Sequence, residues 1–204
     1  MGLLSSTVSL TRYRVEGQVR EPVVETIADA LKTNVIRDID NDSLDRTIGW
    51  TSFENPFNPD FEGASFSVGN ILTFSLRIDK KNIPAKVVQK HWKMEMARRL
   101  ADSGREHLSR NEQKMIKDDV INRLCLRIPS TPNIYDLVWN YEESQLWFFS
   151  TQKAANEELE TLFSKSFKVT LVRLFPFTCA DLTANLSEKE RDVLNSLSPA
   201  AFTE

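Results

Sequence analysis

Seven segments of the chain combine β-branched and aromatic residues with alternating apolar and polar positions, which is the pattern of half-buried strands. The expected strands cover residues 7–15, 48–53, 64–68, 71–78, 134–141, 146–150 and 167–175. Gly69 and Asn70 form a two-residue turn between two of these strands. Residues 142–145 join another such pair. Because strands connected in this way pair as hairpins, we expect antiparallel sheets.

Five further segments place apolar residues at the three- and four-residue spacing of amphipathic helices. These segments are residues 21–32, 82–104, 109–128, 152–165 and 187–197. The second contains an apolar stripe that we expect to face the core. Its members are Val88, Trp92, Met96 and Leu100. Ser109 and Glu112 have the spacing of a capping box, so a new helix is expected to begin there.

The order of these elements predicts an α+β fold, because the strands are joined mainly by hairpins and not by helical crossovers. We expect two split β-α-β-like units joined by a two-helix segment. The predicted division of the chain is an N-terminal α+β unit over residues 1–79, a helical segment over residues 80–132 and a C-terminal α+β unit over residues 133–204.

Charge is distributed unevenly along the chain. Residues 77–127 contain 14 lysines and arginines against 7 acidic residues, a net charge of +7, whereas the whole chain carries -3. The remainder therefore carries -10. A partner experiences this local field and not the average, so the two expected helices form a basic segment within an acidic chain.

Within the basic segment, Lys86, Lys90 and Lys93 recur at helical spacing, away from the apolar stripe. Such a row of lysines can contact the phosphates of duplex DNA without reading its sequence. Arg98 and Arg99 follow on the same helix. These five residues are the predicted DNA-binding residues, and an ordinary solvated helix face is the alternative interpretation.

Few residues suggest catalysis. The two histidines, His91 and His107, have no metal-binding spacing, and the chain contains no glycine-rich phosphate-binding loop. We therefore expect no cofactor and no bound metal. One alternative is a metal-dependent nuclease that uses Asp60, Asp79 and Lys81, because these residues follow a loose pattern in which two carboxylates hold Mg²⁺.

Composition is that of a cytoplasmic protein. No run of 18 or more apolar residues is present, and the N-terminus lacks the basic region of a secretory signal. Cys125 and Cys179 lie far apart, and we expect both to be reduced thiols.

An ordered set of short motifs resembles the RdgC family of recombination-associated proteins, sometimes labelled exonucleases. It begins with Gly49-Trp50, continues through the basic segment and ends with a Ser-x-x-Lys-Ala step at Ser150. Within the basic segment the matching residues are Ile83-Pro84, Val88, Gly104-Arg105, Leu108, Arg110, Glu112 and Ile116-Lys117-Asp118-Asp119-Val120. Trp139 and Lys153-Ala154 complete the set, and the similarity spans residues 7–177.

The resemblance implies a protein that binds duplex DNA without marked sequence preference, associates with the nucleoid and restrains the RecA recombinase. It also implies an α+β fold and a head-to-head homodimer that closes a ring around DNA. Two departures are visible. The family continues Leu-Leu-Pro-Arg-Ala-Phe where this chain has Leu124 to Pro129, and family members extend well beyond its last residue, so the resemblance is to a short form. A protein-interaction module that no longer binds DNA is a further alternative.

Overall fold

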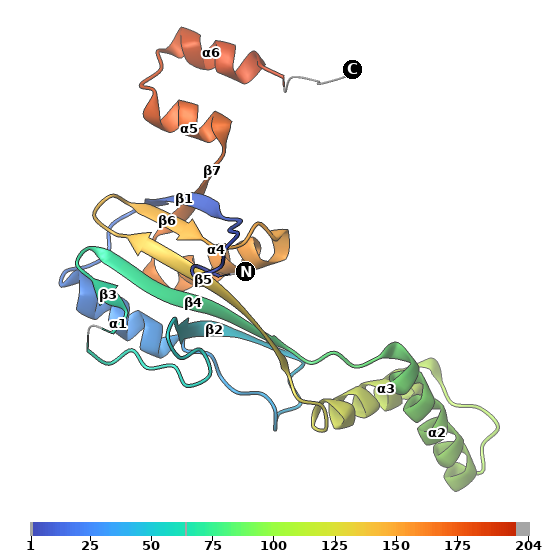
Figure 1. Ribbon diagram of the computed structural model, residues 1–204. Helices are drawn as coiled ribbons and strands as arrows, with labels where there is room; N and C mark the ends of the chain where they lie inside the picture. Colours follow the sequence, from blue (N-terminus) through green and yellow to red (C-terminus); the bar gives the residue numbers. More distant parts are fainter. Residues whose placement is uncertain (1, 64, 199–204) are drawn as a thin grey trace. The chain divides into compact units, whose positions relative to one another are not determined.

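The computed structural model describes residues 2–63 and 65–198, which form an α+β fold (Figure 1). The strands are β1 (Thr11–Glu16), β2 (Arg46–Ser52), β3 (Ser67–Val68), β4 (Ile71–Lys80), β5 (Thr131–Asn140), β6 (Gln145–Phe148) and β7 (Thr170–Leu174). The helices are α1 (Val23–Thr33), α2 (Ala85–Ser103), α3 (Arg110–Cys125), α4 (Lys153–Phe167), α5 (Pro176–Thr183) and α6 (Glu188–Ser196).

The strands form a seven-stranded sheet in the order β2-β4-β5-β6-β1-β7, and β3 pairs with β4. The antiparallel hairpins expected at residues 69–70 and 142–145 are both present, as β3–β4 and β5–β6. The chain divides into two compact units that interleave along the sequence. The first contains residues 1–30, 62–74 and 135–204, and the second contains residues 31–61 and 75–134. The whole predicted segment 80–132 lies in the second unit.

The first unit has an aromatic core between its strands and α4. Tyr13 of β1 is fully buried, and the single proton of its hydroxyl is shared between two acceptors on α4, Oδ1 of Asn156 at 2.6 Å and Oε1 of Glu160 at 2.9 Å. The ring of Trp139 on β5 packs against Phe163 and Phe167 at centroid distances of 4.8 and 5.2 Å. Burial and the Glu160 contact raise the pKa of Tyr13, so its hydroxyl remains a neutral donor in this core.

The second unit depends on one close backbone approach. The backbone of Trp50 bonds to the segment before β2, donating to Asn34 and accepting from Ile36, both at 2.9 Å. A side chain at Gly49 would collide with the backbone of Val35 and Ile36. Only glycine allows this spacing, which leaves the Trp50 side chain fully buried.

Several element predictions differ from the structure. The predicted strand 7–15 begins only at Thr11, and the predicted strand 167–175 begins only at Thr170, because Phe167 is the last residue of α4. β3 contains only two residues, and Ala64, at the start of the predicted strand, lies outside the described residues. α5 begins at Pro176, where we expected the chain only to leave its strand, because proline is favourable in a first helical turn. The stripe on α2 that we expected to be core has no fully buried residue.

Candidate nucleic-acid interface

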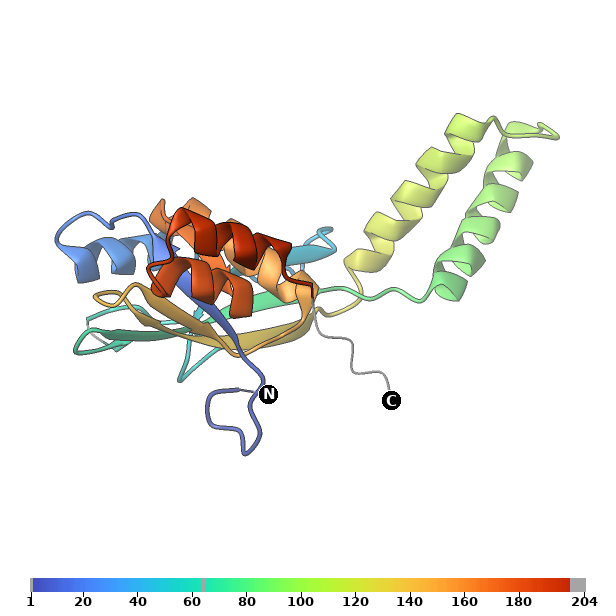
Figure 2. The same cartoon turned by 90° about the horizontal axis from the view of Figure 1, so that it is seen from above.

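Helices α2 and α3 form an antiparallel hairpin, here called the basic hairpin, joined by residues 104–109 (Figure 2). α2 ends at Gly104, which adopts the left-handed conformation expected of a C-terminal glycine. α3 begins with the predicted capping box of Ser109 and Glu112. The Ser109 backbone N–H donates to the Glu112 carboxylate at 2.8 Å, and the Ser109 hydroxyl accepts from the Glu112 backbone N–H at 3.3 Å. Hydrogen bonding to Ser109, chiefly to its backbone N–H, lowers the pKa of Glu112.

The two helices pack through one side of each. The indole Nε1 of Trp92 donates to the carbonyl of Gln113 at 3.1 Å. On α3, Ile116, Val120 and Leu124 are buried, and their four-residue spacing places them on one side of the helix. The apolar stripe of α2 therefore does face a partner, but it is only half-buried because α3 is the main element that covers it.

The three predicted lysines occupy one exposed face of α2, here called the lysine ridge. Lys86, Lys90 and Lys93 are all exposed. Helical spacing centres them opposite Glu95 and more than a right angle from Trp92, the two residues that contact α3. Across the described chain, none of the three lysines forms an ion pair with a carboxylate. Their charges are available to a ligand.

The two predicted arginines do not share that face. Arg99 lies on the α3 side, with Asp119 at 3.3 Å and Glu95 at 3.7 Å, so two carboxylates offset its charge. Arg98 points to a separate flank of α2, where it forms an exposed pair with Asp102 at 3.7 Å. Such exposed pairs contribute little and leave the guanidinium accessible. The structure thus brings together the lysines but not all five predicted residues.

Sequence reasoning missed a cationic contribution from α3. Lys117 and Lys86 line the same groove on one flank of the basic hairpin, together with Trp92 and Ile121. Lys117 follows Lys86 by 31 positions, so no helical spacing relates them. Only the pairing of α2 with α3 places the two lysines at one groove, and that pairing is not encoded in a local pattern.

Lys81 fixes both ends of the basic hairpin. Its side chain is only 4% exposed, and its Nζ donates to the carbonyls of Cys125 at 2.6 Å, Asp42 at 2.8 Å and Asp40 at 3.2 Å. The Lys81 backbone N–H donates to the Asp45 carbonyl at 2.8 Å. Because Cys125 is the last residue of α3, one ammonium connects the segment before α2, the end of α3 and the loop before β2.

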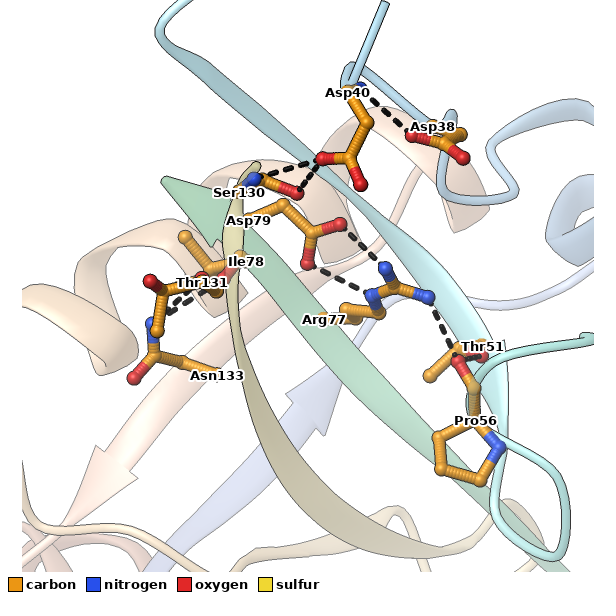
Figure 3. A network of polar contacts seen from close by, with 10 residues as sticks. All are labelled: Asp38, Asp40, Thr51, Pro56, Arg77, Ile78, Asp79, Ser130, Thr131 and Asn133. Atoms are coloured by element: carbon orange, nitrogen blue, oxygen red, sulfur yellow. Dashed lines mark hydrogen bonds and ion pairs between the residues drawn. The ribbon is translucent and has the colours of Figure 1, made fainter. Parts of the chain in front are cut away.

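The same loop holds the chain where it leaves α3 for β5. The carboxylate of Asp40 accepts from the backbone N–H and from the hydroxyl of Ser130, both at 2.7 Å (Figure 3). These two bonds hold the pKa of Asp40 below its ordinary value, so the carboxylate is ionised at neutral pH. Lys81 and Asp40 together anchor the base of the basic hairpin.

Two residues of the nuclease hypothesis, Asp79 and Lys81, form contacts with other protein groups. Asp79 is fully buried and bound through both oxygens to Arg77, at 2.6 and 2.8 Å (Figure 3). The Arg77 guanidinium also donates to the Pro56 carbonyl at 3.1 Å. Lys81 bonds to carbonyl oxygens, and no cluster of three potential metal ligands that includes Asp60 or Asp79 occurs in the described ranges. The structure does not assemble these three residues around a metal position.

An α+β fold that carries a cationic helical hairpin defines the class of this protein. Comparison with protein-family models matches residues 8–189 to the family described as "Putative exonuclease, RdgC". The chain therefore belongs to the recombination-associated RdgC family, as the motifs predicted. No curated protein matches the sequence. Within residues 2–63 and 65–198, no helix has the length and apolar character required to cross a bilayer.

Proposed function

We propose that this protein binds duplex DNA without sequence preference and that the lysine ridge makes the phosphate contacts. The observation that carries the proposal is the placement of Lys86, Lys90 and Lys93 on one exposed face with no carboxylate partner in the described chain. Lysine ammonium groups bind phosphates as point charges and read no base edges, so the expected binding depends on salt and not on sequence.

The dimensions of the ridge suit a phosphate backbone. Lys86 and Lys93 are separated by seven residues, or about 10.5 Å along a helix. Phosphates of one strand recur about every 3.4 Å along the duplex axis, so the ridge spans about three of them. Lys117 extends the cationic surface onto α3.

The role of the lysine ridge in DNA binding can be tested with a variant in which Lys86, Lys90 and Lys93 are all replaced by Glu. Wild-type affinity for a duplex should fall about fortyfold between about 50 and 200 mM salt, the dependence expected for three phosphate contacts. The triple variant should lose binding even at the lower salt concentration, because repulsion replaces attraction. Gel-shift titrations against salt, on duplex and single-stranded DNA, measure both effects.

A matched control separates the effect of the lysine ridge on DNA affinity from the effect of the overall net charge. Replacing the exposed Lys153, Lys165 and Lys189 with Glu changes the net charge equally but leaves the lysine ridge intact. We expect this control to bind with reduced affinity but the same salt slope as wild type. Equal losses in the two triple variants would reject the ridge as the site. Absence of wild-type binding at low salt would favour the protein-interaction module.

Restraint of RecA follows as part of the same proposal. We infer that the protein, as a homodimer associated with the nucleoid, limits RecA by occupying DNA that the recombinase requires. In a strand-exchange assay, wild-type protein should then inhibit RecA, whereas the Lys86, Lys90 and Lys93 triple variant should not. Inhibition by the triple variant would show that restraint does not depend on occupying DNA.

A further inference from the structure

The flank of the basic hairpin that carries Arg98 contains a second groove, of about 370 Å³. Its lining includes three arginines, Arg98, Arg123 and Arg127, and three apolar residues, Met94, Val120 and Leu124. We call this the arginine groove. We propose that it binds a peptide segment of a partner protein in which acidic residues adjoin a large apolar side chain.

Charge at the groove favours an anion. The lining contains three arginines but only one carboxylate, that of Glu95, which lies 3.3 Å from the Arg123 guanidinium. Arg98 has only the exposed pair with Asp102, and the Arg127 guanidinium has no ion-pair partner in the described ranges. Guanidinium groups bind carboxylates through two parallel hydrogen bonds, so acidic side chains suit these arginines.

The base of the groove requires an apolar group as well. Val120 and Leu124 are buried beneath it, whereas Met94 is 60% exposed and so leaves apolar surface in water. Methionine adapts to ligands of different shapes and is common at peptide-binding surfaces. A single apolar side chain inserted here would cover Met94 while its acidic neighbours reach the arginines.

A peptide fits this groove better than DNA does. Duplex phosphates carry no apolar group that could cover Met94. Unpaired bases stack on aromatic rings, and the groove has aliphatic side chains with only the His91 imidazole beside them. The centre of the lysine ridge lies more than a right angle around α2 from Arg98, so the groove and the proposed DNA site are centred on different flanks, and they adjoin where Met94 lies one turn from Lys90.

The test uses a fluorescein-labelled peptide of three aspartates, two leucines and a phenylalanine, titrated with the full chain at about 50 mM salt, where Debye screening is modest. Fluorescence anisotropy should show saturable binding. Replacing either the aspartates or the apolar residues of the peptide with serines should weaken binding at least about tenfold. Equal binding of the peptide that has aspartates but no apolar residue would overturn the proposal, because any cationic surface would suffice.

The decisive variants exploit exposed residues, which tolerate substitution. Met94→Glu and Arg127→Glu should each reduce peptide affinity at least about tenfold, whereas Lys93→Glu on the lysine ridge should change it less than about twofold. DNA affinity should show the opposite pattern. Thermal melts confirm folding, and changes in the NMR methyl signal of Met94 provide an independent reading of occupancy.

Three results would reject the assignment. The first is an absence of peptide binding to the folded wild-type chain. The second is displacement of the peptide by duplex DNA together with loss of DNA binding in Met94→Glu, which would make the groove a nucleic-acid surface. The third is conversion of a dimer to a monomer by Met94→Glu, which would make the groove a contact between two copies of this chain.

Discussion

Lys81 shows how a single residue can be decisive and yet invisible to sequence patterns. Its ammonium donates to three backbone carbonyls, and these carbonyls come from positions 40, 42 and 125, far apart in the sequence. From sequence, Lys81 was one of 14 basic residues in the central segment and a nuclease candidate. By contrast, Ser109 and Glu112 were predicted correctly because both partners of that contact lie within one turn.

Replacing Lys81 with Met should destabilise the protein by about 3 kcal/mol, because buried carbonyls would lose a charged donor. Hydrogen exchange should also accelerate at the start of α2 and the end of α3. Urea unfolding measures the loss in free energy of unfolding. The matched control is Lys80→Met, because Lys80 is exposed and its replacement should lower the free energy of unfolding by less than about 0.5 kcal/mol. Equal unfolding midpoints for the two variants would show that the ammonium does not anchor the basic hairpin.

At the scale of elements, local sequence signals predicted the positions of most helices but not how deeply each helix is buried. The start of α3 and the end of α2 followed from a capping box and a glycine. The half-buried state of α2 did not follow, because a stripe such as Val88 and Trp92 looks the same whether one helix or a whole core covers it. The ion pair of Arg99 could not be predicted for the same reason, since Asp119 on α3 approaches it only after the helices pair.

Helix α2 should accordingly be less stable than α4, which has six buried residues. Its amides should exchange faster than those of α4 in native-state hydrogen exchange. Trp92→Ala should destabilise the basic hairpin by about 2 kcal/mol, because it removes a half-buried ring and the bond to Gln113. Lys93→Ala, on the exposed face, is the control. Comparable protection in α2 and α4 would contradict this account.

On the scale of the whole molecule, the fold class and family could be predicted, whereas the division into units could not. The α+β class followed from strands joined by hairpins. The compact units exchange segments at residues 30, 61, 74 and 134. Three of these four boundaries fall inside α1, β4 and β5, where no loop composition marks them.

We expect the chain to form a homodimer. Helices α5 and α6 and the segment before them leave large apolar side chains in water, including Phe175 at 50% and Val193 at 60% exposure, and a second copy can cover such surface. Sedimentation equilibrium should therefore yield about 46.8 kDa, twice the 23.4 kDa of one chain. The mass should be insensitive to salt. A single 23.4 kDa species at all concentrations would exclude the dimer.

The constraint at Gly49 has a consequence for tracing relatives of this protein. Its glycine is required by backbone spacing in the second unit, whereas Lys86, Lys90 and Lys93 fill no such space and could be exchanged without harm to the architecture. Family membership and the proposed DNA binding therefore depend on different positions. A homologue that keeps the Gly-Trp pair but carries neutral residues along α2 would retain the fold and lack the side chains proposed to contact phosphates.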